Sequence, residues 1–171
     1  MRQWVVFAAI GTALSISYAG SASEGKGIIS GNYVLDESRG DDAFQVIEGA
    51  IAPLSTSERP LLRTMLRKSI AVNRMRIWAA GSRVGITYDD KAPIILWLGG
   101  EPVRWKLIEP LVFDVSAKPD GDAVSLRFLG KYCDRVMTYR MNGKDLVAET
   151  TMSVPQLSKT IIYKQIFSRT N

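Results

Sequence analysis

One stretch of the sequence, residues 134–151, constrains the fold more than any other. It contains two runs of alternating polar and apolar residues, one on each side of the pair Asn142-Gly143. Alternation with a period of two is typical of a half-buried strand, and an Asn-Gly pair tolerates the positive φ angles of a tight hairpin turn. The stretch therefore predicts an antiparallel β-hairpin that turns at Asn142-Gly143.

The first 22 residues predict a secretory signal peptide. Arg2 supplies a positive charge, residues 4–16 are almost free of polar side chains, and small residues follow as far as Ala22. This order is typical of a cleavable export signal. An N-terminal membrane anchor is the alternative, but the apolar run is shorter than the ~20 residues that a spanning helix needs. We therefore expect a periplasmic or secreted protein, with a flexible leader at residues 23–30 and one domain at residues 31–171.

Residue usage excludes several kinds of catalysis. The chain has no histidine and one cysteine, Cys133, so serine–histidine and cysteine–histidine mechanisms are ruled out. Cysteine and histidine clusters that could hold zinc are missing as well. We expect no metal, no cofactor and no enzymatic activity; an enzyme that uses Asp and Tyr is the alternative. Cys133 is either a small buried hydrophobe or the site of an intermolecular link.

The charge of the chain is mildly positive. The formal net charge is +5, or +4 without Arg2, and the basic residues are spread along the chain. Nucleic-acid binding usually shows a clustered basic stripe, so we expect no nucleic-acid partner. Weak contact with an anionic membrane surface is compatible with this charge.

Two amphipathic helices are predicted after a first short strand at residues 31–35. The first helix begins at Asp41 or Asp42 and ends near Pro53. The second has Ser57 as its N-cap, with Pro60 in its first turn. Apolar residues recur on one face of this second helix, and Arg63 and Arg67 lie one turn apart on another face. Those two arginines are either a solvated surface or a docking site for an anionic membrane or a partner.

The rest of the chain predicts an antiparallel meander. Short β-like runs follow one another, separated by Gly, Pro, Asp and Asn. With the first strand they make ten strands, and so long a meander removes its unpaired edges most simply by closing into a barrel. An open sandwich is the alternative. The predicted runs are residues 76–80, 83–88, 93–98, 103–107, 111–117, 123–129, 134–141, 146–153 and 160–168.

This layout resembles the calycins, in particular lipocalin-like and fatty-acid-binding-protein-like barrels. The resemblance lies in Gly31-Asn32-Tyr33, similar to a Gly-x-Trp/Tyr opening, in the two-helix insertion at residues 41–72, and in the meander that ends at residues 163–169. The tail also looks like that of exported bacterial lipocalin-like proteins of unassigned function. The resemblance implies a hydrophobic or lipid-like small molecule held in a barrel cavity. The last strand lacks the Arg-x-Tyr order with which fatty-acid binders hold a carboxylate, so a fatty acid is not specified.

In a barrel, one parity of each strand faces the interior. On residues 134–141, the parity that contains Arg135, Met137 and Tyr139 combines an adaptable apolar group, a phenol and a guanidinium, which suits a ligand with a polar head. Ordinary core packing, with Arg135 at the rim and paired to an acid, is the alternative; Glu149 is the nearest acid in the hairpin. Further candidate contacts, each also compatible with core packing, are Arg127, Tyr163, Trp78, Trp97 and Trp105.

Two functions therefore stay open. The first is an exported carrier that buries a hydrophobic small molecule in the barrel under a two-helix lid. The second is a structural or protein-interaction domain of the cell envelope, whose barrel is filled by side chains. The direction of Arg135, Met137 and Tyr139 bears on the choice between them.

Overall fold

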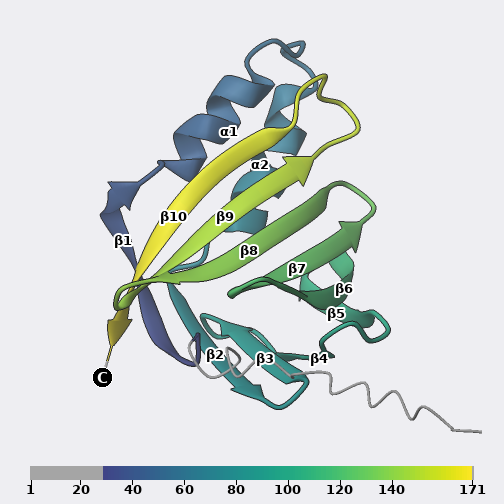
Figure 1. Cartoon of the computed structure of the whole chain (residues 1–171). Coiled ribbons are helices and arrows are strands. Elements are labelled where there is room, and N and C mark those ends of the chain that lie inside the picture. Colours follow the sequence, from purple (N-terminus) through teal and green to yellow (C-terminus); the bar gives the residue numbers. More distant parts are fainter. Residues whose placement is uncertain (1–28, 171) are drawn as a thin grey trace, which may run out of the picture.

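The computed structural model describes residues 29–170, which form a ten-stranded antiparallel sheet and two helices (Figure 1). The predicted signal peptide and leader residues 23–28 lie outside the described residues; Ile29, the first described residue, is buried. The elements are β1 (Gly31–Gly40), α1 (Ala43–Ile51), α2 (Arg59–Ile70), β2 (Arg74–Ala80), β3 (Arg83–Tyr88), β4 (Ile94–Trp97), β5 (Val103–Ile108), β6 (Leu111–Asp120), β7 (Ala123–Gly130), β8 (Asp134–Asn142), β9 (Asp145–Ser153) and β10 (Ile161–Thr170).

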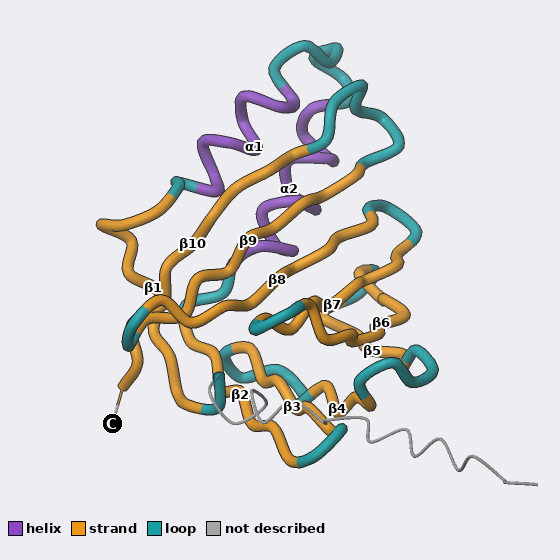
Figure 2. The backbone as a smooth tube through the Cα atoms, in the orientation of Figure 1, coloured by secondary structure: helices purple, strands orange, loops and turns teal. Residues whose placement is uncertain are grey.

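The sheet curls into a nearly closed barrel, so the predicted barrel is confirmed. Neighbouring strands pair in the order β4-β3-β2-β1-β10-β9-β8-β7-β6-β5. The two edge strands, β4 and β5, approach each other across a gap that other contacts bridge. The Gly99 N–H donates to the Ala117 carbonyl on β6 at 2.7 Å, and the Trp105 indole N–H donates to the Ala92 carbonyl at 2.8 Å. Figure 2 shows the strands wrapping around one interior.

The hairpin of β8 and β9 forms as predicted, but its turn lies one residue further along the chain. Asn142 pairs with Asp145, so the two turn residues are Gly143 and Lys144. Gly143 has a φ angle of 63°, which suits the first central position of a type II′ turn. Asn142 stays extended as the last residue of β8, because one glycine at the first central position satisfies this turn.

Strand β1 is longer than predicted. It was expected to end at Leu35, where a polar stretch begins, but it continues to Gly40. Leu35 pairs with Phe167 and Gly40 pairs with Gln165, so residues 36–39 bulge out of the sheet beside β10. The polar side chains of the bulge therefore resemble a loop in the sequence.

The Gly-x-Tyr motif and the end of the last strand meet at one end of the barrel. Tyr33 is 1% exposed, and its hydroxyl donates to the Ile29 carbonyl at 2.9 Å. Arg169 donates from Nη2 to the Tyr33 hydroxyl at 3.0 Å and lies 5.5 Å from the centre of its ring. The first and last strands are thus tied together by side chains as well as by their backbone pairing.

Both predicted helices form and pack against the barrel core. The Asp42 carboxylate accepts from the N–H groups of Phe44 and Gln45, which confirms the N-cap of α1. Ser57 is not the N-cap of α2: Glu58 occupies that position without a side-chain cap, and the Ser57 hydroxyl bonds to Ser55 instead. Figure 1 shows the helices beside and behind the upper ends of β9 and β10, with β2, β3 and β4 at the lower end of the view.

Within residues 29–170, neither helix is long and apolar enough to cross a membrane.

Candidate ligand-binding site

The inner face of β8 carries Arg135, Met137 and Tyr139. Their exposed fractions are 3%, 4% and 0%, whereas the alternate residues of this strand face outward. The structure therefore places this predicted set together on the inner wall of the barrel. Their role as ligand contacts stays a prediction.

Arg135 is a buried cation that is neutralised only in part. Its Nη1 donates to the Ser69 carbonyl in the last turn of α2 at 2.6 Å. The terminal carbonyls of a helix carry a partial negative charge, so this contact is favourable. The guanidinium also lies 4.4 Å from the centre of the Phe128 ring and 5.7 Å from that of Phe113. Arg135 thus attaches the end of α2 to the inner wall.

The predicted partner of Arg135, Glu149, is on the wrong face. Glu149 pairs in register with Thr138 and is exposed on the outside of β9, because side chains alternate along the strand. Arg135 is also not at a solvated rim. Within residues 29–170 no carboxylate forms an ion pair with it.

Two polar atoms on this inner wall have no hydrogen-bond partner within the described residues. They are Arg135 Nε and Thr150 Oγ1. Thr150 pairs in register with Met137 on one side and with Tyr163 on the other, so it lies between β8 and β10. Buried donors without an acceptor are uncommon and cost stability. The inner wall therefore offers at least the Arg135 Nε donor to an acceptor from outside the chain.

Tyrosine hydroxyls complete the polar part of the interior. Tyr88 on β3 and Tyr139 on β8 are 2.6 Å apart at their oxygens, across the barrel. Burial raises the pKa of Tyr88 to about 12 and that of Tyr139 well above its usual value, although the Arg135 charge opposes both shifts. Burial also raises the pKa of Tyr163. These phenols therefore stay protonated near neutral pH and can donate hydrogen bonds.

The other candidate contacts divide between the inside and the outside of the barrel. Trp105 and Tyr163 are buried, at 5% and 2% exposed. The candidate contact Arg127 is not in the interior: Leu126 and Phe128 face inward, so alternation directs Arg127 outward. Trp78 and Trp97 lie on the outer parity of β2 and β4, and Trp97 is 57% exposed.

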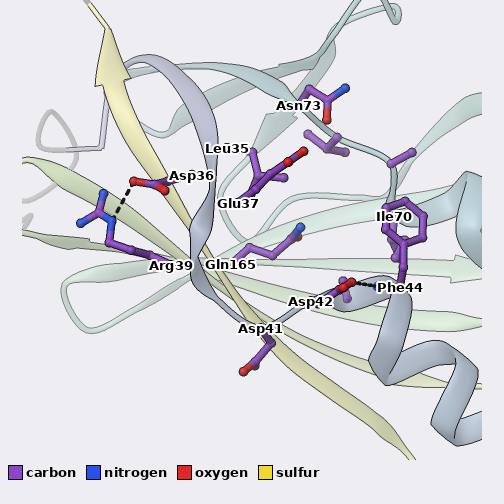
Figure 3. A pocket seen from close by; sticks show the side chains of 13 residues that line it. Leu35, Asp36, Glu37, Arg39, Asp41, Asp42, Phe44, Ile70, Asn73 and Gln165 are labelled. Carbon is purple, nitrogen blue, oxygen red and sulfur yellow. Dashed lines mark hydrogen bonds and ion pairs between the residues drawn. The ribbon is translucent and has the colours of Figure 1, made fainter.

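A pocket of about 470 Å³ lies where the helices join the barrel (Figure 3). Its walls come from the bulge of β1, the start of α1, the end of α2 and the inner parity of β10, where Gln165 is 7% exposed. In Figure 3, Leu35 and Gln165 lie on one side and Phe44 and Ile70 on the other. The wall formed by α2 is the turn that Arg135 holds, so the pocket lies next to the Arg135 contact.

Three of the four carboxylates that line this pocket have partners within the described residues, and Glu37 is the fourth. Asp36 binds Arg39 at 2.8 Å, Asp41 accepts from the Lys164 N–H at 2.7 Å, and Asp42 caps α1. They therefore fix the bulge and the helix start. Sequence reasoning missed this pocket, because its walls come from segments that only the fold brings together.

The two arginines proposed as a docking surface bind an acid of the other helix. Arg63 and Arg67 on α2 lie 2.8 Å and 3.0 Å from the carboxylate of Glu48 on α1. The hydrogen bond from Arg63 and the charges of both arginines hold the pKa of Glu48 below its usual value. Arg67 also stacks on Phe44, at 5.4 Å from the ring centre. These contacts hold α1 against α2.

Cys133 is buried, and burial raises the pKa of its thiol. A thiol of this kind is mostly protonated near neutral pH and behaves as a small apolar group. The part of the chain that the structure describes contains no cluster of three or more Cys, Asp or Glu that could hold a metal ion.

No protein-family model and no curated protein sequence matches the chain. Solved structures match it in fold. A secretory abundant heat soluble protein from Ramazzottius varieornatus is 14% identical, with a TM-score of 0.58 over 84% of this chain and 96% of that one. A Schistosoma mansoni fatty acid binding protein in complex with arachidonic acid is 10% identical, with a TM-score of 0.56 over 88% and 99%.

A third structure, a zebrafish ileal bile acid-binding protein complexed with cholic acid, is 14% identical, with a TM-score of 0.53 over 82% of this chain and 98% of that one. At this identity the likeness shows the fold alone. It confirms the resemblance predicted from the sequence: the described part of the chain has the fold of the fatty-acid-binding-protein-like calycin barrels.

Proposed function

We propose that this protein is an exported carrier that holds a hydrophobic small molecule with an anionic head in its barrel. The observation that carries the proposal is the buried Arg135, which within residues 29–170 has no carboxylate partner and an unsatisfied Nε. A buried charge is expensive unless it is paired and hydrogen-bonded. A ligand carboxylate or sulfonate would supply both the charge and the acceptors that the inner wall lacks.

The surroundings of Arg135 support such a head-group site. The Thr150 and Tyr163 side chains face the interior from the next two strands, and burial keeps the Tyr163 phenol protonated. The apolar tail of the ligand would lie among the buried side chains of the inner wall, where Met137 can adapt its shape. Two of the structural neighbours are described as binding arachidonic acid and cholic acid, both of which carry a carboxylate and an apolar body.

Entry would require a movement of the helices. The pocket of about 470 Å³ meets the inner parity of β10 at Gln165, and its wall is the end of α2. Arg135 binds that end through the Ser69 carbonyl. An anionic head would compete with this carbonyl for the guanidinium, so binding of the head and release of α2 would be coupled.

A second function is favoured by a different observation. Tyr88, Trp105, Phe128 and Phe113 form a chain of edge-to-face ring contacts, with centroids 5.9 to 6.1 Å apart. Such a cluster packs the interior well without a ligand. A barrel filled in this way would serve as a structural or protein-interaction domain.

Titration with a matched pair of ligands separates the two functions. Oleate and oleyl alcohol have the same tail, but only oleate carries a charge at neutral pH. A carrier should bind oleate at least tenfold more tightly than the alcohol, and native mass spectrometry after mild purification should reveal a co-purified acid. A filled barrel should bind neither, and equal affinity for both would remove Arg135 from head-group recognition.

The export part of the proposal rests on the sequence of residues 1–22. Expression of the whole chain in a bacterial host, followed by intact-mass analysis of the envelope fraction, checks it. We expect a product that lacks about the first 22 residues. A full-length protein in the cytoplasm would contradict export without affecting the ligand proposal.

A further inference from the structure

The outer face of β2, β3 and β4 carries a stacked group of three side chains, which we call the Trp–Arg–Trp patch: Trp78, Arg83 and Trp97. Arg83 pairs in register with Trp97, and its guanidinium lies 5.4 Å from the centre of the Trp97 ring. It also lies 5.9 Å from the centre of the Trp78 ring on the neighbouring strand. One cation is thus in contact with two indoles on the outside of the barrel.

The sheet is shaped to seat one of these indoles. Trp78 pairs in register with Gly85, and a Cβ atom at Gly85 would overlap Trp78 Cε2 and Nε1. The indole therefore lies directly on the backbone of β3, at a place where any side chain would displace it. Gly85 is buried although it belongs to the outer parity of β3, because Trp78 covers it.

Apolar side chains on this face remain open to solvent. Trp97 is 57% exposed and Ile95, two residues before it on β4, is 41% exposed. Both belong to the outer parity, so they lie beside the indole of Trp78 and not in the core. Adjoining exposed apolar side chains usually mark a surface that contacts another molecule, whereas isolated ones are common on any protein surface.

The cations of this face differ from five paired arginines elsewhere on the surface, although Arg74 and Arg127 also have no ion pair within residues 29–170. Arg39, Arg63, Arg67, Arg104 and Arg140 each have a carboxylate within 3.8 Å. Within the described chain, neither Arg76 nor Arg83 forms an ion pair or a side-chain hydrogen bond, and both face outward on β2 and β3. A guanidinium that stacks on aromatic rings keeps the N–H groups of its edge available for an oxyanion.

We propose that the Trp–Arg–Trp patch docks the protein on an anionic phospholipid surface. Indoles favour the boundary between lipid head groups and water, and unpaired arginines bind lipid phosphates bidentately. A membrane accepts both the apolar and the cationic part of this face at once. Nucleic acid fits less well, because two unpaired arginines would neutralise few phosphates and Ile95 would gain nothing from them.

The surface differs from the α2 arginines, which share the carboxylate of Glu48 and so have part of their charge offset. It also lies away from the helices, which occupy the opposite end of the view in Figure 1. Docking through β2–β4 would therefore leave α1, α2 and the pocket beside them open to solvent.

Vesicle binding of the full chain tests the proposal. Vesicles of phosphatidylcholine and phosphatidylglycerol in equal parts are compared with pure phosphatidylcholine in a sedimentation assay. Each arginine near an anionic surface contributes about fivefold in partitioning, equivalent to about 1 kcal/mol. We expect Arg83→Gln to weaken binding about fivefold. The matched control, Arg140→Gln on the outer face of β8, should change it less than twofold.

Quenching by lipids with brominated chains makes the test local. The segment before residue 29 is present in every variant, so its contribution to binding is common to all of them. We expect Trp97→Phe to be quenched clearly less than the wild type, since Trp97 is the most exposed indole within residues 29–170, while Trp4 contributes equally to both proteins. Circular dichroism confirms that each variant is folded.

The proposal is overturned if Arg83→Gln binds vesicles as well as the wild type, or if quenching is unchanged in Trp97→Phe. If Arg83→Gln keeps vesicle binding but loses binding of a single-stranded oligonucleotide or a soluble glycan, the patch binds that partner instead of a membrane. Failure of oleate to bind in the barrel would leave this proposal standing, because the two surfaces share no residue.

Discussion

Two arginines of this protein make the same kind of contact in opposite environments. Arg135 lies 4.4 Å from the Phe128 ring centre on the inner wall, and Arg83 lies 5.4 Å from that of Trp97 on the outer wall. Arg135 is 3% exposed and gives a hydrogen bond to Ser69, whereas Arg83 faces solvent. Stacking on an aromatic ring therefore does not by itself define what an arginine does.

The difference lies in what each charge requires. Taking a guanidinium out of water costs several kcal/mol, which one helix carbonyl and two rings offset only in part. Arg135 therefore carries a deficit that an anionic ligand would remove. Arg83 keeps its solvation and has no such deficit, so its contacts with Trp78 and Trp97 leave it free to bind a partner. The first arginine should couple to ligand binding, and the second to docking alone.

The substitution Arg135→Met gives the largest expected effect. It removes the charge while keeping an apolar stem, so oleate affinity should fall by roughly 2–5 kcal/mol, the usual cost of truncating a buried charged partner. The free energy of unfolding should stay within about 1 kcal/mol of the wild type, because the lost contacts are offset by the removal of a poorly compensated charge. Isothermal titration and urea unfolding measure the two quantities.

Arg140→Met on the same strand is the control. Arg140 faces outward and pairs with Asp122 at 3.1 Å, so its removal should affect neither quantity appreciably. If Arg135→Met instead unfolds the protein while oleate affinity per folded molecule is unchanged, Arg135 is a structural group. That result would favour the filled barrel.

Alkaline pH should remove the stability that the buried phenols of the inner wall contribute. The pKa of Tyr88 in the folded state, about 12, lies above its value of 10.0 in the unfolded chain. The neutral phenol therefore contributes stability in full below pH 10, and this contribution is lost as pH rises from 10 to about 12. The slope is about 1.4 kcal/mol per pH unit for each such tyrosine. Urea unfolding at several pH values measures it, and Tyr88→Phe should flatten the curve. An unchanged curve in that variant would contradict the assignment.

The sequence was sufficient to predict the architecture because each strand of this fold has its own local pattern of alternating side chains between turn residues. Alternation and turn residues placed the nine strands of the meander within a few residues of their ends, and the inner parity of β8 followed from residue types alone. The predictions were wrong where tertiary contacts overrode a local sequence preference. Ser57 was a plausible cap, yet Glu58 folded back onto Ser55, and residues 36–39 form a bulge that a polar composition disguises as a loop.

The candidate site was predictable only in part. Arg135 was found, but its assumed partner Glu149 lies on the outer parity of β9, which the alternation of that strand already implied. Thr150 faces inward together with Ala148 and Met152, so the alternation of side chains along β9 could have identified it as well. Ser69 and the pocket near Gln165 had no local signal, because they depend on how the end of α2 meets the barrel.

Gly85 on β3 leaves the space in which the Trp78 indole lies. Gly85→Ala adds one methyl group where the indole lies, so Trp78 must leave the backbone of β3. Overpacking of this kind costs about 1–2 kcal/mol of unfolding free energy. We also expect weaker vesicle binding than in the wild type, although no charge has changed. Ala79→Gly, on the neighbouring strand, is a control for the altered backbone propensity. If Gly85→Ala binds vesicles as well as the wild type, Trp78 covers the backbone of β3 but does not contribute to docking.

The smallest effect is expected at Glu48, and it separates the outer patch from the helices. Glu48→Gln leaves Arg63 and Arg67 without their acid, so the melting temperature should fall by roughly 1–2 °C, as for partly exposed ion pairs. Lowering the pH should produce the same loss in the wild type, because the pKa of Glu48 is depressed and its stabilisation disappears as the carboxyl is protonated.

The Glu48→Gln variant leaves two arginines on α2 without their acid, which makes it a sensitive test of where docking occurs. If the Trp–Arg–Trp patch is the docking surface, brominated-lipid quenching of Trp97 stays as in the wild type. A loss of that quenching, with vesicle binding maintained, would mean that free arginines on the helices turn the protein over on the membrane, and that charge pairing alone decides which face docks.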